Sequence, residues 1–247
     1  MKAHFDGKGD VIVITGGANG IGRALALAVS AAGAQAVVCD RDEMAMAELR
    51  GLDARIDTRR LDVSNRAEVQ AMFGAIEAEH GAIDGLVCGA AIQPRTAIHD
   101  MDPAEWERVI GVNLNGVVWC YQAAIPGMIA RRRGSVIAFS SGLANQGWAK
   151  ASAYATSKAG LIAFLKSAAK EVAEHRVRVN VIWPGVIDTP QYRNANPGQD
   201  GESWKSTLGV GSAEDVVGPL MFLLSDAATM TASALTREMA YSRDMDT

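Results

Sequence analysis

The amino-acid sequence predicts an α/β protein built on a doubly wound parallel sheet of about seven strands with helices on both faces. Short apolar runs alternate with longer stretches of helical periodicity along the 247 residues, the pattern of strands joined by crossover helices. The apolar runs are continuous, as expected of strands that are buried on both faces. No change in composition marks a second domain, so residues 1–247 are expected to form one domain around one large core.

The first strand is expected over 11–14 and leads directly into a glycine-rich turn at 15–22 and a helix over 21–32. Glycines lack a Cβ atom, so backbone N–H groups in such a turn approach a diphosphate closely, and the helix N-terminus favours its negative charge. Glycine turns are common, and this turn alone is weak evidence. Its position between a buried strand and a helix, with a second strand at 36–39, favours dinucleotide binding.

Asp40 ends that second strand, about 20 residues after the glycine turn. A carboxylate there accepts hydrogen bonds from the 2′- and 3′-hydroxyls of a ribose, and its charge repels a 2′-phosphate. Asp40 therefore favours NAD over NADP, although a guanidinium at the neighbouring Arg41 could meet that phosphate. The alternative is that Asp40 caps a helix that runs to about Leu49, which the context makes the weaker interpretation.

The alternation of strands and helices continues beyond this point. Further strands are predicted over 56–61, 83–89, 135–140 and 177–183, with a weak strand at 234–239. Helices are predicted over 66–79, 103–130, 151–174 and 213–224, the first capped by Ser64 and the second by Asp102. Residues 186–212 are polar and contain Gly and Pro, so we expect a surface loop there, with one short helix at 202–207, as a lid over the substrate.

Tyr154 and Lys158 lie four residues apart in the helix predicted over 151–174, so both side chains project from one face. The ammonium should favour the phenolate and lower the pKa of Tyr154 from about 10 toward neutrality. A serine on the preceding strand end can donate a hydrogen bond to the same substrate oxygen. The pattern predicts proton transfer on an alcohol or carbonyl oxygen.

Composition excludes several other classes of function. The net charge of −4, with no basic cluster, argues against nucleic acid as a partner. Cys39, Cys88 and Cys120 stand singly in apolar runs, as reduced thiols of a cytoplasmic protein do. The histidines show no metal-ligand spacing, and we expect no metal site. No signal peptide or membrane-spanning run is predicted either.

The chain resembles the short-chain dehydrogenase/reductase (SDR) family, which has a Rossmann-type fold, from about residue 10 to residue 230. The matching segments are 15–22, Asp62-Val63, Val112-Asn113-Leu114, the set Ser141, Tyr154 and Lys158, and 184–189. The resemblance implies reversible hydride transfer between NAD and a secondary alcohol or ketone, a small-molecule substrate, and a homotetramer or homodimer.

The resemblance also implies roles for the catalytic set. Tyr154 would be the general acid and base, and Lys158 would lower its pKa and hold the nicotinamide ribose. Ser141, rather than its neighbour Ser140, would polarise the substrate oxygen. Asn113 would kink the long helix and hold a water that links Lys158 to solvent.

Cofactor contacts are implied at the carboxyl ends of the strands. In the family, the acid-Val pair contacts the adenine, the residue after the fourth strand passes the ribose, and the segment at 184–189 contacts the nicotinamide. The implied residues are Gly16, Asn19, Gly20, Ile21, Gly22, Asp40, Arg41, Asp62, Val63, Ala90, Tyr154, Lys158, Pro184, Gly185, Ile187 and Thr189.

Substrate contacts are expected by position alone. The expected neighbours are Gln93, Arg95, Leu143, Trp148, Val186 and Tyr192. Arg95 would hold a carboxylate or, as the more common alternative, lie on the surface. Trp148 would stack on a ring or pack under the lid.

Three departures from the family pattern stand out. Cys88-Gly89-Ala90-Ala91 replaces the usual Asn-Asn-Ala-Gly, Thr231-Ala232 replaces Thr-Gly, and the usual Asp-Gly-Gly near 236–241 is absent. The strand and tail at 231–247 are therefore atypical. They leave open an idle NAD-binding scaffold or sensor, against which the complete Ser/Tyr/Lys/Asn set argues. A nucleotide-sugar epimerase would need a larger C-terminal domain.

Overall fold

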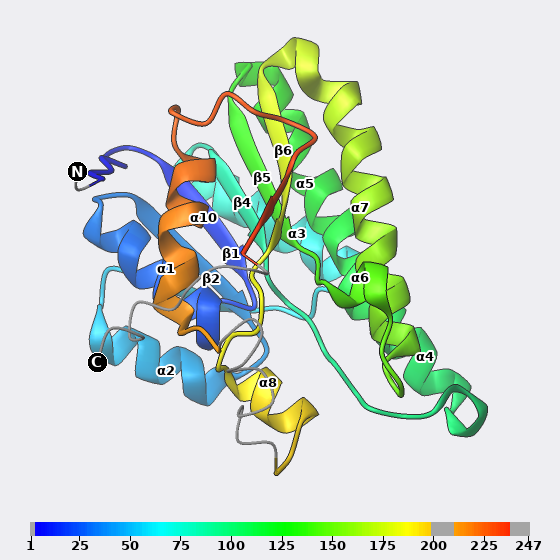
Figure 1. Ribbon diagram of the computed structural model, residues 1–247. Coiled ribbons are helices and arrows are strands. Elements are labelled where there is room, and N and C mark those ends of the chain that lie inside the picture. The colour runs from blue at the N-terminus through cyan, green and yellow to red at the C-terminus, as the bar shows by residue number, and fades with distance from the viewer. Residues whose placement is uncertain (1–2, 199–209, 238–247) are drawn as a thin grey trace.

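The computed structural model describes residues 3–198 and 210–237. Within them, seven parallel strands form one sheet in the order β3-β2-β1-β4-β5-β6-β7 (Figure 1), which confirms the predicted parallel sheet. The strands are β1 (Val11–Thr15), β2 (Gln35–Asp40), β3 (Asp57–Arg60), β4 (Gly85–Cys88), β5 (Gly134–Phe139), β6 (Val177–Trp183) and β7 (Ala234–Thr236).

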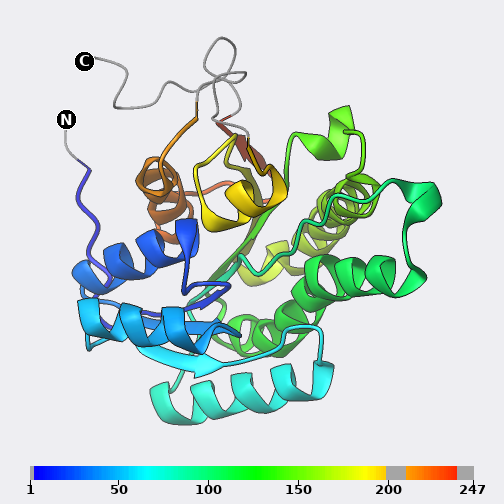
Figure 2. The ribbon, with the colours of Figure 1, turned by 90° about the horizontal axis from the view of Figure 1, so that it is seen from below.

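Helices cover both faces of this sheet, and Figure 2 shows the two helical layers with the strands between them. Those on one face are α3 (Arg66–His80), α4 (Pro103–Ile110), α5 (Gly116–Arg131) and α7 (Ser152–Val172). Those on the other are α1 (Gly20–Ala31), α2 (Glu43–Leu52) and α10 (Val217–Leu224). The short helices α6 (Leu143–Gln146) and α8 (Pro190–Ala195) lie near the carboxyl ends of the strands.

The continuous apolar run in β1 is explained by burial on both faces. Val11 and Val13 belong to the core under α3, α5 and α7, whereas Ile12 and Ile14 belong to the core under α1 and α10. All five residues of β1 are buried. Alternate side chains of one strand therefore serve two cores, which removes any need for polar positions in between.

The order of the strands creates a crevice at the carboxyl edge of the sheet. From β1 the chain proceeds outward through β2 to β3 and then returns to place β4 beside β1 on its other side. The segments that follow β1 and β4 therefore diverge, and in open α/β sheets ligands bind where they do. The glycine-rich turn leaves β1 at this point.

Several helix boundaries differ from those predicted. The helix expected over 103–130 is interrupted by a π-helical segment, η2 (Gly111–Asn115). Asn65, rather than Ser64, caps α3 by accepting hydrogen bonds from the Ala67 and Glu68 N–H groups, and Asp42 caps α2 by accepting from the Ala45 N–H. In both cases the observed cap is the residue directly before the helix, from which the side chain reaches the free N–H groups.

The polar region expected to be a loop contains a helix of its own. Thr189 caps α8 by accepting a hydrogen bond from the Tyr192 N–H, and Pro190 occupies its first position. The helix predicted at 202–207 and the tail after 237 lie outside the described residues. In the described chain, no helix has the length and apolar character required to cross a membrane.

Candidate active site

A cavity of ≈1010 Å³ opens at the carboxyl edge of the sheet. Every residue predicted to contact the cofactor borders it, together with Ser141 and five of the six predicted substrate neighbours. The exceptions among the predicted site residues are Asn113, which is buried behind the wall, and Trp148. One continuous space thus joins the glycine turn to the Tyr154 side chain.

The glycine turn is shaped by close backbone contacts. Gly16 has a φ of +66°, and a Cβ atom there would lie 2.6 Å from Cα and N of Ala90. A Cβ on Gly22 would lie 2.5 Å from the carbonyl oxygen of Gly16. Only glycine fits at these points, because the segment after β4 crowds Gly16 and the turn itself crowds Gly22.

Asp40 connects the end of β2 to the glycine turn. One carboxylate oxygen accepts a hydrogen bond from the Ala18 N–H (3.0 Å), and the other accepts from the Arg41 N–H (2.7 Å) and the Asp42 N–H (3.1 Å). The interpretation of Asp40 as a helix cap is wrong, because Asp42 fills that position. Asp40 instead brings a negative charge to the wall of the cavity.

Arg41 and Asp62 form an ion pair beside Asp40. The guanidinium lies 3.5 Å from a carboxylate oxygen of Asp62. Partial burial would raise the pKa of Asp62, but hydrogen bonds from Ser64 and the charge of Arg41 outweigh it and lower that pKa below its ordinary value. Asp62 therefore compensates the charge of Arg41 at this end of the cavity.

Tyr154 and Lys158 lie together on one face of α7, and both are buried. The Lys158 ammonium is 5.6 Å from the centre of the Tyr154 ring and donates a hydrogen bond to the Phe139 carbonyl oxygen (2.8 Å). The predicted spacing on one helix face is thus present. Ser141 follows β5, and its hydroxyl makes a hydrogen bond with Tyr154 that favours the phenolate.

The expected fall in the pKa of Tyr154 is wrong for this site. Burial raises the pKa of Tyr154 to about 12, although the Ser141 hydrogen bond and the charge of Arg95 act in the opposite direction. Burial also lowers the pKa of Lys158 to about 8. Each group loses water that would stabilise its charged form, and this loss exceeds the effect of the charges nearby.

Asn113 connects the π-helical segment to the wall of the cavity. Its side-chain oxygen accepts a hydrogen bond from the Ile92 N–H (2.8 Å), and its amide donates to the Ile92 carbonyl (2.9 Å) and to the Ser157 hydroxyl (3.2 Å). The expected break in the helix is present at this residue. Its role in holding a water stays a prediction.

Two of the predicted substrate neighbours, Trp148 and Arg95, differ in how the structure places them. Trp148 does not border the cavity formed by the described residues and is 50% exposed, and its contact with a substrate or with the lid stays a prediction. Arg95 does not extend into solvent as a surface arginine would; its guanidinium binds Ala195 and Asn196 at the end of α8 and borders the cavity.

Arg237 supports a wall of the cavity, a role that the sequence did not reveal. Its guanidinium donates to the Pro184 carbonyl oxygen (3.0 Å), and its N–H donates to the Trp183 carbonyl (2.9 Å). It also lies 3.9 Å from Asp215, and both side chains are nearly buried. Arg237 therefore holds the segment that starts at Pro184; its only sequence signal is a large cation where the family has Asp-Gly-Gly.

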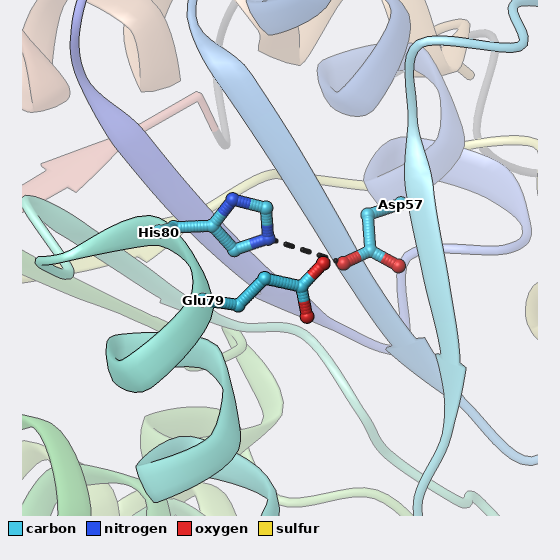
Figure 3. A group of neighbouring side chains, drawn as sticks. All are labelled: Asp57, Glu79 and His80. Atoms are coloured by element: carbon cyan, nitrogen blue, oxygen red, sulfur yellow. Dashed lines mark hydrogen bonds and ion pairs between the residues drawn. The ribbon is translucent and has the colours of Figure 1, made fainter.

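A group of possible metal ligands lies elsewhere. Asp57, Glu79 and His80 place one ligand atom each within 4.8 Å of one another (Figure 3). Arg59 already pairs with Asp57 (2.6 Å) and Glu79 (2.5 Å). None of these residues borders the cavity, and the cluster is an ion-pair network that ties β3 to the end of α3.

The chain is similar to known dehydrogenases and reductases over most of its length. The sequence profile of the short chain dehydrogenase family matches residues 10–200. The 3-oxoacyl-(acyl-carrier-protein) reductase of Thermotoga maritima is 34% identical over 229 residues, which cover 90% of this chain and 93% of that protein. The cis-4-hydroxycyclohexanecarboxylate dehydrogenase of Sinomonas cyclohexanicum is 35% identical over 233 residues, covering 91% and 93%.

Solved structures agree in fold over nearly the whole chain. The ligand-free aldohexose dehydrogenase of Thermoplasma acidophilum matches with a TM-score of 0.87 and 30% identity, covering 99% of both chains. Such coverage includes both the glycine-turn half and the Tyr154 half of the fold. The chain therefore belongs to the short-chain dehydrogenase/reductase family of oxidoreductases.

Proposed function

We propose that the protein is an NAD-dependent oxidoreductase of the EC 1.1.1 type, which moves a hydride reversibly between NAD(H) and a secondary alcohol or its ketone. One observation carries the proposal: Ser141, Tyr154 and Lys158 border the same cavity as the glycine turn and Asp40. Proton-transfer groups and a dinucleotide cradle in one continuous space suit this reaction.

The residues present fit a nicotinamide dinucleotide. At Gly16 and Gly22 a Cβ atom would collide with the protein backbone, so only glycines allow the tight turn that makes its backbone N–H groups available to a diphosphate. The proposed adenine contacts are Asp62 and Val63, and Ala90 lies beside the glycine turn. When bound, the dinucleotide supplies a hydride acceptor or donor, and Ile187, Thr189 and Lys158 would hold its nicotinamide half.

Asp40 supports NAD rather than NADP. Its carboxylate lies at the cavity wall without a paired cation in the described chain, whereas Arg41 is already paired with Asp62. Asp40→Asn keeps an oxygen that can accept from Ala18 and removes the charge, so we expect the NADP/NAD ratio of kcat/KM to rise about tenfold or more. Glu43→Gln, an exposed change of equal charge, is the control. An unchanged ratio in Asp40→Asn would contradict the role of Asp40.

Tyr154 is proposed to transfer the proton that accompanies the hydride, with Ser141 beside it. Because burial raises the pKa of Tyr154 to about 12, the side chain is a neutral phenol at pH near 7 and is suited to donate a proton to a carbonyl oxygen. In the reverse direction the phenolate takes the proton of a hydroxyl, which alkaline pH favours. Ser141 donates to the substrate oxygen, where negative charge develops.

Replacing Tyr154 tests the proposal. Tyr154→Phe should remove more than roughly nine-tenths of kcat while leaving the NADH dissociation constant nearly unchanged, because only the proton donor is lost. Tyr121→Phe changes a buried tyrosine whose hydroxyl bonds to the Ala168 carbonyl, and it is the matched control. Retention of more than about a tenth of kcat would show that another group is the acid. NADH binding by a wild-type protein that turns over no alcohol or ketone would favour an idle scaffold.

The protein is further proposed to act as a homotetramer, or a homodimer, in the cytoplasm. The family resemblance supports the assembly, and the three buried free thiols suit a reducing compartment. Light scattering coupled to size-exclusion chromatography measures the assembly directly, and a monomer at micromolar concentration would contradict it.

A further inference from the structure

Arg95 links two walls of the cavity. It lies in the segment after β4, and its Nε atom donates to the Ala195 carbonyl oxygen (3.3 Å) at the end of α8. Its Nη2 atom donates to the side-chain oxygen of Asn196 (3.1 Å). Both acceptors are neutral, so these contacts orient the guanidinium and leave its positive charge uncompensated.

The charge of Arg95 finds no carboxylate among residues 3–198 and 210–237. Its Nη1 atom is shielded from water and has no hydrogen-bond acceptor there. By contrast, Arg41 at the cavity wall and Arg237 beside Pro184 each lie near a carboxylate. Burial lowers the pKa of Arg95 below its ordinary value, as expected of a cation with too few partners. A buried N–H group without an acceptor destabilises the folded protein, and a ligand that accepts its hydrogen bonds would remove this penalty.

The uncompensated guanidinium lies in the same cavity as the proposed catalytic acid. Arg95 and Tyr154 both border it, and the positive charge of Arg95 is one of the smaller effects that act to lower the pKa of the phenol. A substrate whose hydroxyl meets Tyr154 therefore has a cation within reach of the rest of its structure. Gln93 and Tyr192 border the same cavity.

We propose that Arg95 binds a carboxylate of the substrate, so that the enzyme acts on secondary alcohols that bear a carboxylate and on the matching oxo acids. This inference rests on the proposed function and names its substrate class. The carbinol C–H bond breaks and its hydride leaves for NAD, the hydroxyl proton passes to Tyr154, and a C=O bond forms, while the carboxylate is unchanged. Arg95 is here a binding residue that holds the part of the substrate that does not react.

The guanidinium favours a carboxylate over other anions. The contacts of Nε and Nη2 with the end of α8 leave both hydrogens of Nη1 and the second hydrogen of Nη2 uncommitted. Two parallel N–H groups match the two oxygens of a planar carboxylate, and one negative charge balances one guanidinium.

Matched pairs of acids and amides test the inference. The probes are 2-, 3- and 4-hydroxycyclohexanecarboxylate, which hold the carbinol at increasing distances from the carboxylate, each with its primary carboxamide. For the wild-type protein with NAD, we expect at least one acid to exceed its amide in kcat/KM by ~10- to 100-fold. In Arg95→Gln this ratio should fall to about 1, and in Arg95→Lys it should be intermediate. The ratio is internal to each variant, so a general loss of activity does not imitate the result.

A control and a binding measurement separate the possible outcomes. Arg193→Gln removes an exposed guanidinium from α8, paired with Asp188, that does not border the cavity, and it should keep the wild-type ratio. Calorimetry with NAD-loaded Tyr154→Phe protein measures acid and amide binding without turnover. If no acid binds or reacts better than its amide, or if Arg95→Gln keeps the preference, the inference is overturned. If the wild-type protein turns over none of a wider set of alcohols, the proposed function fails, and calorimetry alone decides the role of Arg95.

Discussion

The two halves of the cavity are built in different ways. In the half formed by β1, α1 and β2, the walls are mostly backbone: the glycine turn packs against the backbone of Ala90, and the Ala18 N–H donates to the Asp40 carboxylate, 22 residues away. In the half that faces α8, contacts join distant segments: Arg95 and Asn196 are 101 residues apart, and Arg237 and Pro184 are 53 apart. The first half depends on backbone shape, and the second depends on individual side chains that bridge loops.

This difference has a consequence for mutational sensitivity. A backbone cradle has no spare volume, so even one methyl group displaces two chain segments at once. A bridged loop tolerates change better, because a lost guanidinium releases one segment while the sheet stays intact. We therefore expect larger losses from glycine changes in the first half than from arginine changes in the second.

The largest effect is expected from Gly16→Ala. The new Cβ would lie 2.6 Å from backbone atoms of Ala90, at a φ that disfavours alanine, so the turn must move. We expect NADH affinity, measured by fluorescence titration, to fall ~100-fold or more, with a loss of a few kcal/mol in stability. Gly74→Ala, in the exposed middle of α3 where nothing lies within 4 Å, should instead stabilise the protein slightly. Equal affinity in both variants would contradict the cradle.

A smaller effect is expected from Arg237→Ala in the other half. Loss of the hydrogen bond to the Pro184 carbonyl should loosen the segment that starts there, raising KM for NAD about tenfold, with ~1–3 kcal/mol of lost stability. Steady-state kinetics and thermal unfolding measure both quantities. Arg193→Ala removes an exposed ion pair and should cost less than ~1 kcal/mol. A KM that stays at the wild-type value would show that Pro184 needs no such support.

The pH dependence of alcohol oxidation offers a finer comparison. The Ser141 hydrogen bond opposes the effect of burial and holds the pKa of Tyr154 below the value it would otherwise have. Ser141→Ala should therefore move the alkaline rise of kcat/KM to higher pH, because less phenolate is present at any given pH. If kcat/KM of Ser141→Ala is lower at every pH but the midpoint of its alkaline rise is unchanged, Ser141 acts on the substrate and does not affect the pKa of Tyr154.

The smallest effect is expected in stability against pH. Lys158 has a pKa of about 8 in the folded protein, against an ordinary value of 10.5, so the unfolded chain binds more protons between these values. Stability from this group is therefore lost as pH falls through that window and is present above it. As pH rises from about 8 to about 10, the Tm of wild type should therefore increase relative to the Tm of Lys158→Met. If the difference in Tm between the two proteins does not change with pH, the lowered pKa of Lys158 is contradicted.

The sheet and the first half of the site follow from local pattern. Continuous apolar runs predict strands that serve two cores, and β1 does so. The glycine turn comes between β1 and α1, and the spacing of Tyr154 and Lys158 places both on one face of α7. Each of these features depends on the backbone geometry of a few consecutive residues, so each can be predicted from the sequence.

The other features of the site depend on burial and on contacts between segments that are distant in the sequence. The direction of the Tyr154 pKa depends on how many segments exclude water from the phenol, which no spacing reveals. Arg95 borders the cavity because α8, whose end lies 100 residues further along the chain, packs beside it and accepts its hydrogen bond. Arg237 matters only because β7 pairs with β6 and brings it to Pro184. Spacing along the chain sets which residues share an element, but solvent exclusion and charge compensation arise only when distant elements pack together.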